Sequence, residues 1–279
     1  MGFVATLNAA WRQHDSMLCV GLDPDRAKLP DHLRQREDGI FEFCRDIVDA
    51  CAGLACAYKP QIAYFSSERA EAQLERLIEH IKKQQPGVPV ILDAKRGDIG
   101  ATAQHYAKEV FERYCADAVT VSPYMGFDSI EPYLNYRDRG VILLCRTSNP
   151  GGDDLQMLDV VGGEKLFEQV ARLAAGRWNT TGELGLVVGA TYPAELRRVR
   201  LLAPTLPLLV PGIGAQGGDL QASVAAGIDA NGYGMIVSSS RQILFASKGR
   251  DFANAAARVA ADTRNALRRA TDSAKAHNP

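Results

Sequence analysis

Short apolar runs alternate with amphipathic segments along the whole chain. The runs are rich in Val, Ile, Leu and Ala and have the length of buried parallel strands. They span residues 17–22, 55–59, 88–94, 118–121, 141–145, 184–188, 206–210 and 235–237. Helical patterns lie beside them at 3–12, 40–52, 67–84, 99–113, 129–135, 164–178, 194–202, 218–226 and 252–269. This order predicts repeated strand–helix units around a parallel sheet.

Eight such units favour an α/β fold with a single closed (β/α)8 TIM barrel, because closure leaves no edge strand unpaired. A doubly wound open sheet is the alternative, and a count of eight strands argues against it. The 279 residues fit one barrel domain, 1–279, that begins with a short N-terminal helix. The stretch 147–163 is rich in turn formers and predicts a long loop after the fifth strand. We expect the tail 271–279 to be frayed.

Composition narrows the possible partners. The chain is 46% hydrophobic and 23% charged with a net charge of −1, which is ordinary for a soluble protein and gives no sign of nucleic-acid binding. No apolar run is long enough to cross a membrane, and the amino terminus lacks the pattern of a secretion signal. The six cysteines form no C-x-x-C pair, so we expect buried, reduced thiols in a cytoplasmic protein. The five histidines are scattered, so we expect no metal site.

A charged stretch, residues 93–102, follows the third apolar run. Alternate residues of a strand share a face, so Asp93 and Lys95 are predicted to point the same way. Gly97 permits a sharp turn, and Asp98 can cap the helix that begins near Ile99. In TIM barrels the chemistry lies at the carboxyl ends of the strands. The stretch therefore predicts catalytic charges, and a solvated strand end with a helix cap is the simpler alternative.

Other strand ends place polar groups at the same barrel mouth. Asp23 follows the first strand, Lys59 ends the second and Ser122 follows the fourth. Each has an ordinary explanation as well: an Asp-Pro turn, a lysine that extends to solvent, and a turn or cap serine. Taken alone these signals are weak, but all of them fall at the end where substrates bind.

The seventh and eighth strands end in residues suited to phosphate. The loop that begins at Pro211 and Gly212 also contains Gly214 and Gln216, and it has the G-x-G-x-x-G spacing of a dinucleotide fingerprint. That fingerprint belongs to an early unit of an open sheet, so a nicotinamide-dependent oxidoreductase ranks last. In a barrel these loops commonly hold a phosphate, and Arg241 can bind its oxygens bidentately. The pattern predicts a phosphorylated small molecule whose reacting end lies over strands two and three.

Together these motifs resemble the signature of the orotidine 5′-monophosphate decarboxylase family, which catalyses the last step of de novo uridylate synthesis. The pattern D-x-K-x-x-D-I-x-x-T covers 93–102, and the other strand ends match in order. The chain is similar to the longer bacterial subgroup, with its Lys-Arg-Gly-Asp core and extended loop after strand five. The resemblance implies a carboxy-lyase of pyrimidine biosynthesis that converts orotidine 5′-monophosphate to uridine 5′-monophosphate without metal or other cofactor.

The resemblance also implies roles for single residues. Lys59, Asp93, Lys95 and Asp98 would form an alternating charge network. Lys95 would protonate C6 of the pyrimidine as carbon dioxide leaves, and Asp93 would lie against the substrate carboxylate. A homodimer with shared sites is implied, in which Asp98 and Thr102 come from the partner subunit. The implied substrate-binding residues are Asp23 and Lys59 for the ribose, Ser122 for the pyrimidine edge, Gln216 and Arg241 for the phosphate, and Pro211, Gly212 and Gly214 beside them.

Two other functions stay open at this point. Sugar-phosphate aldolases or decarboxylases related to hexulose phosphate synthase resemble this D-x-K-x-x-D core but use magnesium. Lys59 and the pair Ile99 and Thr102 favour the metal-free pyrimidine reaction. A catalytically silent barrel that only binds nucleotides would tolerate the loss of Lys95, and the complete charge set argues against it.

Overall fold

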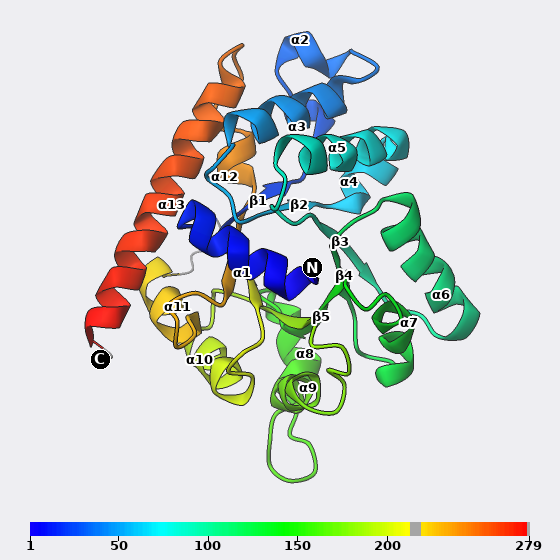
Figure 1. Ribbon diagram of the computed structural model, residues 1–279, viewed down its shortest axis with the longest axis vertical. Helices are drawn as coiled ribbons and strands as arrows, with labels where there is room; N and C mark the ends of the chain where they lie inside the picture. Colours follow the sequence, from blue (N-terminus) through cyan, green and yellow to red (C-terminus); the bar gives the residue numbers. More distant parts are fainter. Residues whose placement is uncertain (213–218, 278–279) are drawn as a thin grey trace.

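Eight parallel strands form one sheet that closes into a barrel. The structure is a computed structural model that describes residues 1–212 and 219–277. The strand order is β2-β1-β8-β7-β6-β5-β4-β3 (Figure 1). Parallel bridges from Tyr58 to Val90 and from Gln61 to Asp93 join the two ends of this order. The predicted (β/α)8 TIM barrel is confirmed, and the open doubly wound sheet is excluded.

Each of the eight predicted apolar runs contains a strand. The strands are β1 (Leu18–Leu22), β2 (Ala57–Pro60), β3 (Ile91–Arg96), β4 (Ala118–Val121), β5 (Gly140–Arg146), β6 (Leu184–Val188), β7 (Leu208–Pro211) and β8 (Met235–Ser239). All five residues of β1 and of β6 are buried, as expected for strands covered on both faces. Strands β3, β5 and β8 continue further than predicted, into polar residues at their carboxyl ends, and β2 and β7 each continue by one proline.

The longer helices surround this sheet, with α1 lying across one end. They are α1 (Phe3–His14), α3 (Gly39–Ala50), α5 (Glu71–Gln84), α6 (Gly100–Lys108), α9 (Leu166–Ala175), α10 (Pro193–Leu202), α11 (Leu220–Gly227) and α13 (Phe252–His277). Shorter turns are η1 (Arg26–Lys28), α2 (Asp31–Arg34), α4 (Ile62–Ser66), η2 (Glu109–Arg113), η3 (Phe127–Ser129), α7 (Glu131–Leu134), η4 (Pro150–Gly152), α8 (Asp153–Gln156) and α12 (Arg241–Leu244). In the part of the chain with described structure, no helix is long and apolar enough to cross a membrane.

Two predicted segments need correction. The loop 147–163 is interrupted by η4 and α8, so it is partly helical. The tail was expected to fray after the last helix, but α13 continues to His277. Ala270 and Thr271 are buried in this extension, and that burial extends the helix beyond the point that the sequence pattern indicated.

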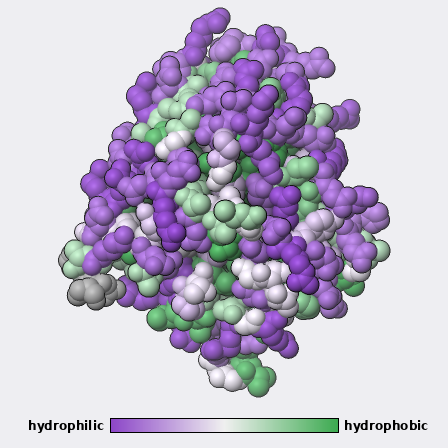
Figure 2. All heavy atoms as spheres, viewed as in Figure 1, coloured by the Kyte–Doolittle hydropathy of each residue, from purple (hydrophilic) through white to green (hydrophobic). Residues whose placement is uncertain are grey.

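Helix α1 crosses the amino-terminal end of the barrel and closes it (Figure 1). Phe3, Leu7 and Trp11 on its inner face are buried. A Cβ added to Gly140, the first residue of β5, would lie 2.3 Å from the Phe3 ring, so only glycine admits this contact. Mainly hydrophilic side chains cover this face (Figure 2). The opposite end, formed by the carboxyl ends of the strands, is left for a ligand.

A buried arginine fastens the amino-terminal end of the barrel. The Arg200 side chain of α10 is 8% exposed and has no carboxylate partner among the contacts of the described residues. Its guanidinium donates hydrogen bonds of 2.8–3.3 Å to the carbonyl oxygens of Gly227, Ala203, Pro204, Leu206 and Gly234. Burial lowers the pKa of Arg200 to about 10, so the group stays cationic at neutral pH. This cation joins α10, α11 and the segments that lead into β7 and β8.

Candidate active site

A cavity of about 200 Å³ lies at the carboxyl ends of the strands. Seven predicted site residues line it: Asp23, Lys59, Asp93, Lys95, Pro211, Gly212 and Arg241. They come from the ends of β1, β2, β3 and β7 and from the start of α12. The structure therefore brings together the charged strand ends and the residues predicted to bind phosphate, which lie far apart in the sequence. Gly214 and Gln216 lie outside the described residues.

One carboxylate stands between two ammonium groups at the centre of this cavity. Lys59 Nζ lies 2.8 Å from Asp93 Oδ2, and Lys95 Nζ lies 2.6 Å from Asp93 Oδ1. Lys59 and Asp93 are each 6% exposed, whereas the Lys95 side chain is 47% exposed. Lys95, which can contact a ligand, is thus linked through the Asp93 carboxylate to the buried Lys59.

The charges of this cluster are set by competing effects. Burial of Asp93 opposes its ionisation, but the ammonium groups of Lys59 and Lys95 outweigh burial and hold the pKa of this carboxyl well below its usual range. Burial likewise disfavours the Lys59 cation, but Asp93 and Asp23 outweigh it and raise the pKa of Lys59. Both groups are therefore ionised at neutral pH.

The backbone of β3 is irregular where these charges lie. Leu92 pairs with Val119 and Arg96 pairs with Val121, so the register of β3 against β4 shifts between them. Lys95 has a left-handed φ of +45°, which is uncommon for a residue with a side chain. Asp93 and Lys95 do meet as predicted, but through a bulge rather than through regular strand alternation.

The turn after β3 also differs from its prediction. The residues with positive φ here are Lys95 (+45°) and Gly100 (+56°), not Gly97. Asp98 is not the N-cap of α6, because that position belongs to Ile99. The Asp98 carboxylate instead accepts a hydrogen bond of 2.8 Å from the Ile99 N–H.

Three predicted site residues do not line the cavity of their own chain: Asp98, Thr102 and Ser122. Thr102 is exposed on α6, where it lies with His105 and Tyr106 in a separate surface depression. The backbone N–H of Ser122 donates a 2.7 Å hydrogen bond to the Arg96 carbonyl. The chain by itself therefore assembles only part of the predicted constellation.

The ends of β1 and β8 approach each other closely at the cavity. Ser240 donates a hydrogen bond of 2.5 Å to Asp23 Oδ2. A Cβ on Gly21 would lie 2.8 Å from the Ser240 Cβ, so a side chain at Gly21 would push the two strand ends apart. The other carboxylate oxygen, Asp23 Oδ1, is buried and has no hydrogen-bond partner within the described structure. A buried acceptor at a cavity wall is suited to a ligand hydroxyl group.

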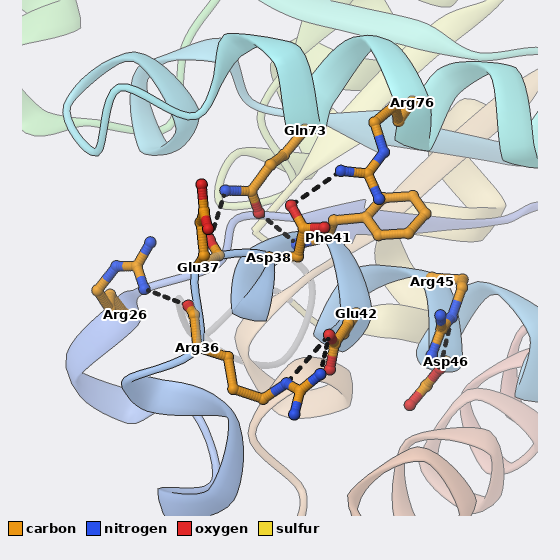
Figure 3. A network of polar contacts seen from close by, with 10 residues as sticks. All are labelled: Arg26, Arg36, Glu37, Asp38, Phe41, Glu42, Arg45, Asp46, Gln73 and Arg76. Atoms are coloured by element: carbon orange, nitrogen blue, oxygen red, sulfur yellow. Dashed lines mark hydrogen bonds and ion pairs between the residues drawn. The ribbon is translucent and has the colours of Figure 1, made fainter.

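A polar network ties the segment after β1 to the segment after β2. Arg26 binds Glu68 at 2.6 Å and also donates to the carbonyl of Arg36. Figure 3 shows its continuation, in which Gln73 and Arg76 of α5 hold the start of α3. These ion pairs are largely exposed and individually weak. As a set they fix the relative position of the loops that follow Asp23 and Lys59.

Among the cavity residues that the sequence prediction did not name, two hold predicted site residues in place. Ser240 holds Asp23, and Thr120 of β4 holds the irregular end of β3. The only signal for Thr120 was a hydroxyl group inside the apolar run 118–121. Ser240 is one of three consecutive serines, and nothing in the sequence distinguished it from the other two.

The family of the chain follows from its relatives. A sequence model of the "Orotidine 5′-phosphate decarboxylase / HUMPS family" matches residues 16–256. The chain is 65% identical over 267 residues to "Orotidine 5′-phosphate decarboxylase" of Dechloromonas aromatica (strain RCB), covering 96% of this chain and 98% of the relative. The chain belongs to the orotidine 5′-phosphate decarboxylase / HUMPS family. The predicted resemblance is confirmed.

Other members of this family extend the likeness. "Orotidine 5′-phosphate decarboxylase" of Azoarcus sp. (strain BH72) is 66% identical over 267 residues, covering 96% of this chain and 98% of the relative. The solved structure of Leishmania donovani OMP decarboxylase is 43% identical with a TM-score of 0.82, covering 96% of this chain and 99% of that one. A putative orotidine-monophosphate decarboxylase from Toxoplasma gondii is 38% identical with a TM-score of 0.85, covering 97% of each chain.

The grouping and burial of the histidine, cysteine and acidic side chains decide whether the described residues offer a metal site or a reactive thiol. Within the described ranges, no three His, Cys, Asp or Glu side chains are grouped so as to hold a metal ion. The six cysteines are free, and all but Cys115 are buried. Burial raises the pKa of Cys19, which lies beneath Lys59 and Asp93, to about 12, so this thiol stays protonated.

Proposed function

We propose that the chain decarboxylates orotidine 5′-monophosphate to uridine 5′-monophosphate in pyrimidine biosynthesis, without metal or another cofactor. One observation carries the proposal: Asp93 holds the partly exposed Lys95 ammonium at 2.6 Å, in the wall of a cavity that also contains Arg241. This arrangement offers a fixed cation at one end and a phosphate-binding cation at the other.

The proposed reaction breaks the bond between C6 and the carboxylate carbon, and the electron pair stays on C6. Carbon dioxide leaves, and Lys95 transfers a proton from its ammonium group to C6. Solvent then returns a proton to Lys95, so the net reaction consumes one proton. Without an electron sink in the substrate ring, stabilisation must come from a charge already in place where the carbanion develops. The ionised Asp93 holds the Lys95 ammonium group in the orientation for that role.

We assign the rest of the substrate to the rest of the cavity. The phosphate binds Arg241 beside Pro211 and Gly212, and the ribose hydroxyls meet the unpaired Asp23 Oδ1 and Lys59. A single ion pair cannot supply the 8–23 kcal/mol or so by which enzymes lower barriers. Binding energy from the remote phosphate must therefore be used to position the ring against Lys95.

We also propose a homodimer with shared sites. Asp98 and Thr102 lie outside the cavity of their own chain, which is expected if they complete the site of a partner. Three large apolar side chains in the segments that follow β3 and β4 are exposed: Ile99 after β3, and Tyr124 and Met125 after β4. Such a group of exposed apolar residues is typical of a protein–protein contact. We place this dimer in the cytoplasm, in line with its free cysteines.

The test is an absorbance assay with orotidine 5′-monophosphate and chelator-treated protein. We expect the ultraviolet absorbance of the substrate to fall as product forms, at the same rate with and without added magnesium. A folded sample that leaves the absorbance unchanged would refute the proposed function. Activity that disappears with the chelator and returns with magnesium would refute the metal-free mechanism.

A further inference from the structure

Thr120 makes an unusual set of contacts beneath the charge cluster. It lies in β4, is 1% exposed and faces the cavity. Its hydroxyl donates a hydrogen bond of 2.9 Å to Asp93 Oδ1. The Thr120 hydroxyl oxygen in turn accepts hydrogen bonds from the backbone N–H groups of Ala94, at 3.1 Å, and Lys95, at 3.0 Å. One donor and two acceptor positions are all that a hydroxyl has, so every one of them is used on β3.

These contacts replace the backbone pairing that β3 loses in its bulge. From Leu92 to Arg96 the strand advances four positions, while its partner advances only two, from Val119 to Val121. The residues between them cannot all find a backbone partner on β4. The Thr120 hydroxyl satisfies two of the N–H groups that the bulge leaves over. One of the two belongs to Lys95, the residue with the left-handed φ of +45°.

We propose that Thr120 is a positioning residue for the reaction, through its hold on Asp93 and on the backbone of Lys95. The hydroxyl fixes the carboxylate oxygen that binds Lys95 Nζ, and it also fixes the peptide from which the Lys95 side chain starts. Both ends of the catalytic lysine are therefore set by one atom of β4. This inference rests on the proposed function.

Its expected effect falls on turnover rather than on substrate binding. The proposed phosphate and ribose contacts lie on other strands, so we expect them to change little when the hydroxyl is removed. A small displacement of Lys95 from C6 is sufficient to slow proton transfer, since misplacement by about 1 Å can cost about 100-fold in rate. Loss of the hydroxyl should therefore lower kcat and leave KM almost as it was.

The decisive variants are Thr120→Val, which keeps the shape and removes the hydroxyl, and Thr120→Ser, which keeps the hydroxyl. The matched control is Thr271→Val, because Thr271 is also buried and donates a 3.0 Å hydrogen bond, but within α13. We expect Thr120→Val to lose about 100-fold in kcat at nearly constant KM. We expect Thr120→Ser to recover most of the loss, and the control to resemble the wild type. If Thr120→Val does not fold, Thr120→Ala is judged by the same criteria.

Amide hydrogen exchange provides a readout that needs no substrate. The N–H groups of Ala94 and Lys95 should exchange faster in Thr120→Val than in the wild type, and Thr271→Val should leave them unchanged. Unaltered exchange at these two amides, an unaltered kcat in Thr120→Val, or an equal loss in the Ser and Val variants would each overturn the positioning role. An inactive wild type would refute the proposed function, while the exchange data would still test the geometry.

Discussion

Two buried cations at opposite ends of the barrel, Lys59 and Arg200, are held in opposite ways. Lys59, at the carboxyl ends of the strands, is paired with Asp93, and its carboxylate neighbours raise its pKa. Arg200, near the amino-terminal ends, donates to backbone carbonyl oxygens and to no carboxylate among the described residues, and burial lowers its pKa to about 10. A carboxylate partner gives an ionised cluster whose charges can interact with a ligand. Carbonyl partners give a fixed cross-link, in which the charge of Arg200 stabilises the fold and is not available to a ligand.

The comparison separates two consequences of burying charge. Buried ion pairs contribute little net stability, because desolvation offsets much of their attraction. The cluster around Lys59 is therefore expected to matter mainly for chemistry. A cation with five carbonyl acceptors leaves several buried groups unsatisfied when it is removed, so Arg200 is expected to matter mainly for stability.

The largest effect is expected at the catalytic end. Lys95→Ala should lower kcat by about 1000-fold, because removal of one preorganised donor at the reacting atom costs about 100- to 1000-fold and Lys95 is also the proposed proton donor. The free energy of unfolding should change little, since the Lys95 side chain is half-exposed. Steady-state assays and denaturant titration measure the two effects. Lys82→Ala is the control, because Lys82 forms a 2.8 Å ion pair with Asp117 away from the cavity. Retention of most activity in Lys95→Ala would refute the role of this lysine.

The opposite result is expected at the other end. Arg200→Met should lower the free energy of unfolding by about 3 kcal/mol, because buried carbonyl oxygens lose a charged donor. The kcat per folded molecule should stay close to that of the wild type. Urea titration and an assay at a temperature where the variant is folded test this. A variant as stable as the wild type, or one with impaired kcat, would remove the distinction between the two ends.

Acid should distinguish the two ends as well. The folded pKa of Asp93 is depressed, so its ionisation stabilises the protein above the unfolded pKa of about 4, and this stability is lost as the pH falls. The difference in unfolding free energy between wild type and Asp93→Asn should therefore shrink by about 1 kcal/mol between pH 6 and pH 3. The difference between wild type and Arg200→Met should stay constant, because Arg200 does not titrate there. Denaturant titrations across this pH range give both differences, and equal trends would contradict the assignment.

The smallest expected signal comes from mixed dimers, and it tests whether the catalytic end needs a second chain. Lys95→Ala and Asp98→Ala should each be inactive. When they are unfolded and refolded together, about half of the dimers are mixed, and one site in each receives both intact residues. About a quarter of all sites should then recover decarboxylation.

A second mixture serves as the control for this experiment. Lys95→Ala with Asp93→Ala should recover nothing, since both residues line the cavity of the same chain. If the first mixture also stays inactive while subunit exchange is demonstrated, Asp98 serves its own chain and the shared-site proposal is wrong.

The fold and the charged end of the site could be predicted from the sequence, whereas the local backbone geometry could not. Strand periodicity placed Asp23, Lys59 and Asp93 at strand ends, and the barrel then brought them together. The left-handed Lys95 could not be predicted, because the bulge depends on how β3 registers against β4. The role of Thr120 depends on the same register. Position along one chain also gave no means to tell whether Asp98 faces its own cavity.

The closure of the barrel gives the ion pair of Lys59 and Asp93 a second, structural role. In the part of the chain that the structure describes, β2 and β3 meet through two isolated bridges rather than a continuous ladder. Lys59 belongs to β2 and Asp93 to β3, so their ion pair crosses the junction between these two strands. If the barrel opened between β2 and β3, the contact between Lys59 and Asp93 would break, and we expect the site to lose its activity. Selection on turnover therefore acts on a contact that also crosses the junction between β2 and β3.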